Sequence, residues 1–248
     1  MKIKLIFNSI ISSIILIISG CGNQQKTELK GGQIVACIGD SVTYAGGNGY
    51  VEYLQKNVNE AYPVLDLTFL NWGKNSETIT GLSEAEHPFP RPYLFDRLSE
   101  EIKKQKIDVA IFNYGINCGI YGEPSEELFS MYEKGVNRFL DTMQKYDVKV
   151  VLLTPPPFAL KAAKQNGWKP TSEVKYSWKN PYENYDEEVI QEFKKIILSK
   201  THPAIIKKID IHEPLTKNQH KCYGKDPIHP KKKGYELIGE TVMAGLGF

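Results

Sequence analysis

The stretch "QIVACIGDSVTY", residues Gln33 to Tyr44, decides how the rest of the chain is interpreted. Its first seven residues form a run of strand length and β-rich composition, and the glycine that ends it is followed by Asp40 and Ser41. A serine in this place either closes a turn or stands at the sheet edge where open parallel sheets bind ligands. Gly-Asp-Ser is too common a tripeptide to decide between these alternatives, so the residues elsewhere must do so.

From residue 33 onward, apolar runs of strand length alternate with amphipathic stretches of helix length. This pattern predicts repeated βα units, and therefore an α/β fold with a parallel sheet covered by helices on both faces. The third run is the most apolar and is expected at the centre of the sheet. The expected strands cover 33–39, 65–73, 108–116, 149–157 and 205–212, and the expected helices cover 50–62, 92–105, 125–146, 185–200 and 231–246.

The first twenty residues have the composition of an export signal. A short cationic region, "MKIK", precedes an apolar stretch that is too short and too rich in serine for a spanning helix. It ends in "ISGC", so we expect cleavage before Cys21 and diacylation of its thiol, with an uncleaved anchor as the alternative. We therefore expect an exported protein that is lipid-anchored to the bacterial cell envelope, periplasmic or at the cell surface. Residues 21–32 form a polar tether, and residues 33–248 form one domain.

Charge and cysteine content exclude several functional classes. Once Lys2 and Lys4 are removed with the signal peptide, basic and acidic residues balance, so no basic field favours a nucleic-acid partner. Cys37, Cys118 and Cys222 lack the spacing of a metal site or a redox motif. We expect buried or partly buried thiols, and a disulfide between two of the three cysteines stays open.

Two segments interrupt the alternation of strands and helices, Gly81–Pro92 and Pro155–Tyr185. Both follow predicted strand ends, and long irregular loops in a compact domain usually carry function. Arg91 in the first segment is expected to solvate its loop rather than to contact a substrate anion. The aromatic residues of the second either stack against a sugar over the site or pack the loop onto the sheet: Trp168, Tyr176, Trp178, Tyr182 and Tyr185.

A nucleophilic Ser41 requires a base at the same sheet edge, because a serine hydroxyl is a weak nucleophile until its proton is removed. Of the five histidines, only His229, in "DPIHP", has an aspartate three residues before it, Asp226. In a short proline-braced loop, that carboxylate can fix the tautomer of the ring and stabilise the imidazolium. The alternative for the pair is an Asx turn beside a surface histidine.

Hydrogen-bond donors for an oxyanion follow the second and third predicted strands. Gly73 in "NWGKNSET" offers a backbone N–H, and Asn117 in "YGIN" offers a side-chain amide. Together with the N–H of Ser41, these groups make three donors for a tetrahedral oxyanion. Asp40 is expected to hold the turn by accepting hydrogen bonds from nearby backbone N–H groups.

The order Gly-Asp-Ser, strand-end Gly, Gly-x-Asn and Asp-x-x-His resembles the SGNH hydrolase superfamily, also called GDSL esterases, over residues 33–248. The resemblance implies a flavodoxin-like three-layer α/β/α sandwich with a five-stranded parallel sheet, an acyl-serine intermediate and no metal or cofactor. It implies a nucleophile and oxyanion donor at Ser41, further oxyanion donors at Gly73 and Asn117, a base at His229 and its orienting carboxylate at Asp226.

Two positions depart from the pattern of the superfamily. Ser76 replaces the second glycine of N-x-G-x-x-G, which puts the backbone geometry of that turn in doubt. Cys118 replaces the aspartate of the usual Asn-Asp, which puts in doubt the bond that braces the third loop. Thiol chemistry at Cys118 is not expected, since no histidine stands at a suitable spacing.

The expected function is a serine esterase that removes short acyl groups, acetyl above all, from a carbohydrate or another acylated small molecule. The stretches around Ser76 and Asn117 look like those of exported bacterial members that occur near polysaccharide-handling enzymes. Three alternatives stay open at this point: a lipid acylhydrolase or lysophospholipase, a polysaccharide O-acetyltransferase, and a non-catalytic binding module on the same fold.

Overall fold

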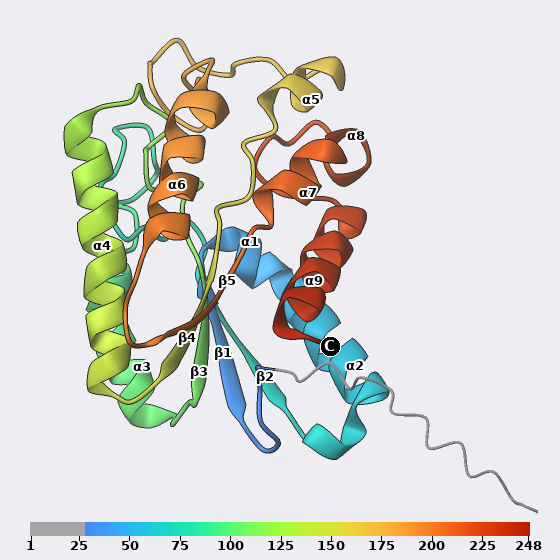
Figure 1. Cartoon of the computed structure of the whole chain (residues 1–248). Coiled ribbons are helices and arrows are strands. Elements are labelled where there is room, and N and C mark those ends of the chain that lie inside the picture. Colours follow the sequence, from blue (N-terminus) through green and yellow to red (C-terminus); the bar gives the residue numbers. More distant parts are fainter. Residues whose placement is uncertain (1–27) are drawn as a thin grey trace, which may run out of the picture.

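Five strands form one sheet in which every neighbouring pair runs parallel. The computed structural model describes residues 28–248, and the strand order is β2-β1-β3-β4-β5, which is the flavodoxin-like order (Figure 1). The prediction of a five-stranded parallel sheet with the third strand at its centre is confirmed. The strands are β1 (Ile34–Gly39), β2 (Thr68–Gly73), β3 (Val109–Asn113), β4 (Lys149–Leu153) and β5 (Ile205–Ile209).

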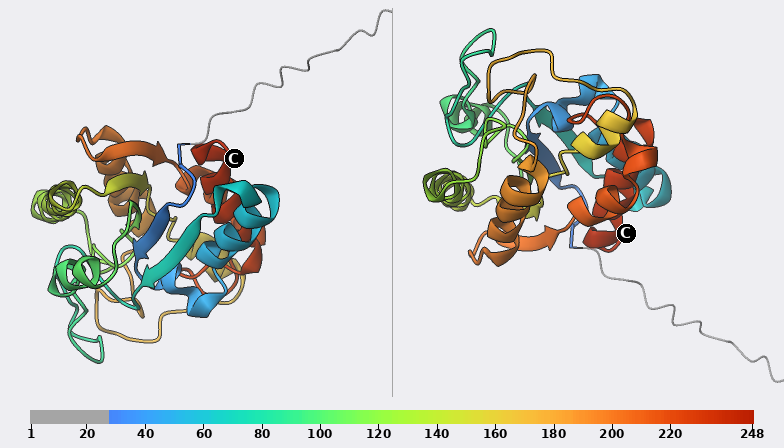
Figure 2. Two further views of the ribbon diagram at one scale, coloured as in Figure 1. Left: turned by 90° about the horizontal axis from the view of Figure 1, so that it is seen from below. Right: turned by 90° about the horizontal axis from the view of Figure 1, so that it is seen from above.

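Helices cover both faces of the sheet and complete a three-layer sandwich. Helices α2 (Tyr50–Ala61) and α9 (Lys232–Leu246) pack together on one face, and α3 (Leu98–Lys104), α4 (Glu126–Lys145) and α6 (Gln191–Ser199) lie on the other (Figures 1 and 2). Ser125 caps α4 by accepting a hydrogen bond from the Leu128 N–H at 3.1 Å, as the sequence predicts. The remaining short helices are α1 (Ser41–Tyr44), α5 (Leu160–Gln165), α7 (His212–Lys217) and α8 (Gln219–Cys222).

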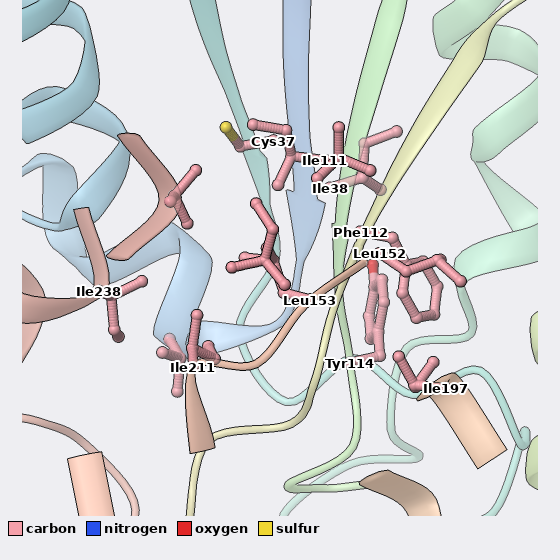
Figure 3. Close-up of a cluster of buried hydrophobic side chains, with 14 of the residues drawn as sticks. Cys37, Ile38, Ile111, Phe112, Tyr114, Leu152, Leu153, Ile197, Ile211 and Ile238 are labelled. Carbon is pink, nitrogen blue, oxygen red and sulfur yellow. The ribbon is translucent and has the colours of Figure 1, made fainter. Parts of the chain in front are cut away.

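The core consists of the strand side chains and the inner faces of these helices. Every residue of β3 is buried, because a parallel strand covered on both faces must be apolar on both. Ile111 and Phe112 of this strand lie among Leu152, Leu153 and Ile197 in the cluster that Figure 3 shows. Each such side chain contributes about 1.5–3 kcal/mol when fully buried, so the core holds the strand ends in place.

Several segments differ from the sequence-based expectation. The predicted helix over 92–105 is broken at Arg97, whose guanidinium binds the buried Glu77 and the carbonyl of Trp72 instead of facing solvent. The predicted helix over 185–200 opens with a π-helical turn, Tyr185–Ile190, whose first side chain is held by Gly119 and Ile116. Helices α5, α7 and α8 were not expected.

The carboxyl ends of β1 and β3 form the switch point of the sheet. The chain leaves β1 toward β2 on one side, while β3 pairs with the other side of β1. Open α/β sheets bind ligands in the crevice outside such a point. Ser41 follows β1 directly and Asn117 lies four residues past β3, so both stand at this crevice.

The predicted signal peptide, residues 1–20, and the lipidation site Cys21 lie outside the described residues. Among residues 28–248, no helix is long and apolar enough to cross a bilayer. The last part of the predicted tether packs against the domain, since Leu29 is buried and the N–H of Glu28 donates to the carbonyl of Leu246. The folded unit therefore begins a few residues earlier than 33.

Candidate active site

Ser41 is the first residue of α1, immediately after β1. Asp40 caps this helix: its Oδ1 accepts a hydrogen bond from the Val42 N–H at 2.9 Å, as expected for a residue that holds the turn. Burial raises the pKa of Asp40 to about 7, against the effect of this hydrogen bond and the charge of His229. Because the first N–H groups of a helix have no partner within it, the Ser41 N–H stays available to a ligand.

His229 and Asp226 reach Ser41 from the loop before α9. His229 Nε2 lies 3.0 Å from Ser41 Oγ, and His229 Nδ1 lies 2.7 Å from Asp226 Oδ2. The other carboxylate oxygen of Asp226 accepts hydrogen bonds from the N–H groups of Ile228 and His229. Asp226 thus forms an Asx turn and orients the imidazole at the same time, so the two alternatives considered from the sequence coexist.

The charges around Ser41, His229 and Asp226 favour proton transfer from the serine to the histidine. Partial burial lowers the pKa of His229, but the hydrogen bond and charge of Asp226, together with Asp40, outweigh it and raise that pKa above 6.5. Burial raises the pKa of Asp226, but the bonds from His229 and the loop N–H groups outweigh it and hold that pKa below its usual range. Both shifts favour an ionised Asp226 beside His229 and stabilise the imidazolium that forms if His229 accepts a proton.

Asn117 presents its amide to the same cavity. Its Oδ1 accepts a hydrogen bond from the Tyr121 hydroxyl at 2.7 Å, which assigns Nδ2 to the other side of the amide. Nδ2 makes only a long contact, 3.4 Å, with the carbonyl of Glu77. A buried amide held in this way can donate a hydrogen bond to a negatively charged oxygen near Ser41.

Gly73 does not reach the cavity, which corrects the expectation for this residue. Its N–H donates to Asn71 Oδ1 at 3.0 Å, and a Cβ at this position would lie 2.1 Å from the Tyr44 nitrogen. Gly73 is therefore required for the close approach of β2 to α1. The cavity is lined instead by Asn75 and Ser76 from the following turn.

Ser76 is the better candidate for the third oxyanion donor. It lines the cavity, its φ is +63°, and no acceptor for its N–H lies within residues 28–248. A left-handed backbone favours glycine, which explains the glycine found here in the resembling pattern. This role was not predicted from the sequence, although the departure from N-x-G-x-x-G marked the position.

Arg91 is buried rather than solvated, contrary to the sequence-based expectation, and only 7% of it is exposed. Its guanidinium forms two 2.6 Å hydrogen bonds with the carboxylate of Glu84 and a third, at 3.2 Å, with the carbonyl of Ser76. His87 Nε2 lies 3.0 Å from Ser76 Oγ. The loop 81–92 therefore holds the turn that contains Ser76. The sequence did not suggest that His87 takes part in this.

The cavity around Ser41 has a volume of about 590 Å³. Its wall includes exposed aromatic side chains from three separate segments, Tyr44, Phe89 and Trp178. Of the aromatic residues in 155–185, Trp178 faces this cavity, whereas Tyr185 lies in the core and Tyr176 contacts Tyr182 edge-on. The long loop thus supplies both a wall of the site and packing of its own.

The thiols lie away from this chemistry. Cys37, Cys118 and Cys222 are free and buried, and burial raises the pKa of the Cys118 thiol well above its usual range. Within residues 28–248, no group of three or more His, Cys, Asp or Glu side chains is arranged to hold a metal ion. The carbonyl of Cys118 accepts a hydrogen bond from Thr80 Oγ1, which joins the second and third loops.

The GDSL-like lipase/acylhydrolase family model matches residues 37–237, most of the chain. The protein belongs to this family. It is accordingly a hydrolase of carboxylic esters on the SGNH fold. No curated protein sequence matches this family member significantly.

Solved structures share the fold of this GDSL-family chain at low sequence identity. LAE5, an α/β hydrolase from the metagenome of Lake Arreo, is 19% identical with a TM-score of 0.61 over 88% of this chain and 97% of that one. Axe2, an acetylxylan esterase from Geobacillus stearothermophilus, is 18% identical with a TM-score of 0.61 over 88% of this chain and 96% of its own. Alanine variants of Axe2 at a serine, and at an aspartate and histidine three positions apart, are described as catalytic mutants.

Proposed function

We propose that this family member is a serine esterase in which Ser41, His229 and Asp226 act as a catalytic triad. The observation that carries the proposal is the continuous chain of short contacts from Asp226 through His229 to Ser41 at an open cavity. The reported catalytic serine, aspartate and histidine of Axe2, with the same spacing between the last two, support it.

In the proposed reaction, Ser41 Oγ attacks the carbonyl carbon of the ester while His229 Nε2 takes its proton. The N–H groups of Ser41 and Ser76 and the amide of Asn117 stabilise the oxyanion. His229 then protonates the leaving alcohol, which departs as the acyl-serine forms. Water, deprotonated by His229, attacks the acyl-serine, and collapse of the second oxyanion releases the acid and regenerates Ser41.

The proposed substrate is a short acyl ester, most of all acetyl, on a carbohydrate. Aromatic side chains at the rim, Tyr44, Phe89 and Trp178, offer flat apolar faces to sugar rings. The acetylxylan activity stated for Axe2 supports the same class. Export and lipid anchoring through Cys21, proposed from the sequence, would place the enzyme where such glycans occur.

Hydrolysis of p-nitrophenyl acetate, butyrate and octanoate by the wild type and Ser41→Ala tests the proposal. We expect activity to fall with chain length in the wild type and to be lost in the variant. Full activity in Ser41→Ala would refute the nucleophile. Activity that rises toward octanoate would indicate a lipid acylhydrolase, and transfer of acetyl to sugar with little hydrolysis would indicate an acetyltransferase.

A further inference from the structure

A second cavity of about 550 Å³ adjoins the catalytic one. The two share Trp178, Ile228 and His229 in their linings, so one extended ligand can occupy both. The second cavity is formed by the segments 167–171 and 178–179 of the long loop and by 225–229 before α9. Its volume is within the range of about 300–1,000 Å³ that is usual for ligand sites.

Three lysines line this second cavity, Lys169, Lys179 and Lys225. Within the described part of the chain, none of their ammonium groups forms an ion pair with a carboxylate. Lys161 and Lys164 of the neighbouring α5, in contrast, are paired with Glu187 and Glu183. The positive charges at the cavity are therefore not neutralised by ion pairs, unlike those of Lys161 and Lys164.

The lining holds three ammonium groups and one carboxylate, so its net charge is positive. The one acidic residue among the lining residues is Asp226, which is already bonded to His229. Glu173, in the same loop as Lys179, does not line the cavity. Because like charges in a concave surface reinforce one another, this cavity attracts anions more strongly than the same lysines on a convex face would.

The aromatic residues of the second cavity suit a sugar ring. Trp168 and Trp178 both belong to the lining, and the Lys179 ammonium lies 5.4 Å from the centre of the Trp178 ring. This contact holds an ammonium at the boundary between the two cavities. A ligand that combines flat apolar faces with a negative charge fits such a lining better than a neutral glycan or a lipid does.

We propose that this second cavity is a binding subsite for an acidic sugar, so that the substrate is an acylated anionic glycan. The inference rests on the proposed esterase function and names its substrate class. The acyl group lies at Ser41, and a neighbouring residue of the same glycan chain places its carboxylate or sulfate among Lys169, Lys179 and Lys225. The three ammonium groups act on binding and orientation and take no part in proton transfer.

The first experiment measures specificity. We would compare kcat/KM for acetylated oligogalacturonides and for acetylated xylooligosaccharides, using the full-length chain in detergent. The wild type should prefer the acidic substrate, and this preference should weaken as salt increases. The triple variant Lys169→Gln, Lys179→Gln, Lys225→Gln should reduce the ratio of the two kcat/KM values about tenfold.

A matched control removes the same charge elsewhere. The triple variant Lys104→Gln, Lys134→Gln, Lys145→Gln changes exposed lysines on α3 and α4, none of which lines either cavity. It should keep the wild-type ratio. Two outcomes would overturn the proposal. Equal kcat/KM ratios in all three proteins would mean that the lysine charges have no effect on specificity. An equal fall in both triple variants would mean that the effect comes from long-range charge and not from the cavity.

The second experiment separates this inference from the esterase itself. Calorimetry with Ser41→Ala measures binding of oligogalacturonate, a sulfated galactan oligosaccharide and neutral xylohexaose without turnover. Binding of either anionic probe that is lost in the lysine triple variant supports the subsite, even if the wild type hydrolyses no ester, and the stronger probe identifies the carboxylate or the sulfate. If the neutral probe binds as tightly as both anionic ones, the subsite is refuted while hydrolysis by Ser41 stands.

Discussion

Two sides of the catalytic cavity are held in different ways. On the side of the proposed triad, Asp226 binds the N–H groups of its own turn, and Asp40 caps the helix that carries Ser41. On the side of the proposed oxyanion donors, Ser76 is held by Arg91 and His87, which lie eleven or more residues away in the sequence. Local hydrogen bonds thus position the proposed reacting groups, whereas contacts between distant loops position the proposed donor Ser76.

This difference predicts that the two sides respond differently to substitution. Changes in the triad should abolish the reaction while the fold persists, because half-exposed side chains there contribute little to stability. Changes around Ser76 should act on stability and activity together, because a buried ion pair holds that loop. The four predictions below test this contrast.

The largest effect is expected for His229→Ala. Loss of the base should lower kcat for p-nitrophenyl acetate by at least about 10⁴-fold, and the double variant with Ser41→Ala should be no slower than either single one, since the two residues act as a unit. Circular dichroism should show an unchanged fold. A double variant that is much slower than both single variants would contradict the shared role.

Asp226→Asn should have the second largest effect and should lower kcat for p-nitrophenyl acetate by roughly 10³- to 10⁴-fold. Neutral His229 is the active form and its pKa is raised, so wild-type kcat/KM should rise with pH and level off above an inflection higher than 6.5. Without the carboxylate the imidazolium is less stable, so the inflection should move to lower pH. The pH–rate profile measures this directly.

The control for that profile is Asp141→Asn. Asp141 lies 3.3 Å from His202 Nε2 at the surface, so it also pairs with a histidine but lies away from Ser41. This variant should leave the inflection where it is. An inflection that stays in place in Asp226→Asn would show that another group limits the wild-type rate.

Arg91→Met should lower stability and activity together, because Arg91 binds the carbonyl of Ser76. It leaves the buried carboxylate of Glu84 unpaired, with 3% of its side chain exposed, so the free energy of unfolding in urea should fall by about 3–5 kcal/mol. Lys103→Met, which breaks the exposed pair with Glu100, should lower the free energy of unfolding far less. Equal losses in the two variants would mean that Arg91 does not brace the loop.

The smallest effect is expected for Ser76→Gly. Glycine keeps the N–H and tolerates the positive φ, so the loss of the His87 contact should lower kcat/KM by only about threefold, and stability should change by no more than about 1 kcal/mol. Ser76→Val is the informative partner, because a β-branched residue is strained at this φ and should lower both quantities further. Identical rates for Val and Gly would argue against a role for this turn.

The sequence predicted the sheet and the contact between Asp226 and His229 well because both depend on local patterns. Strand runs at 33–39 and 149–157 are apolar on both faces, which a buried parallel strand requires. Asp226 and His229 are three residues apart in one turn, so their contact needs no distant partner. The breaks at Arg97 and Tyr185 were missed because side chains from other loops override helical periodicity there.

By itself, the sequence determined the α/β class, the order of the chemical groups along the chain and the turn that joins Asp226 to His229. Only the tertiary structure decided that Ser76 rather than Gly73 faces the catalytic cavity and that Arg91 is buried. It also decided that Lys169, Lys179 and Lys225 line the second cavity together. The physical reason is the distance along the chain over which each interaction acts. Strand burial and Asx turns act over a few residues, whereas the direction of an N–H, the burial of a charge and the grouping of like charges depend on segments that meet only after folding.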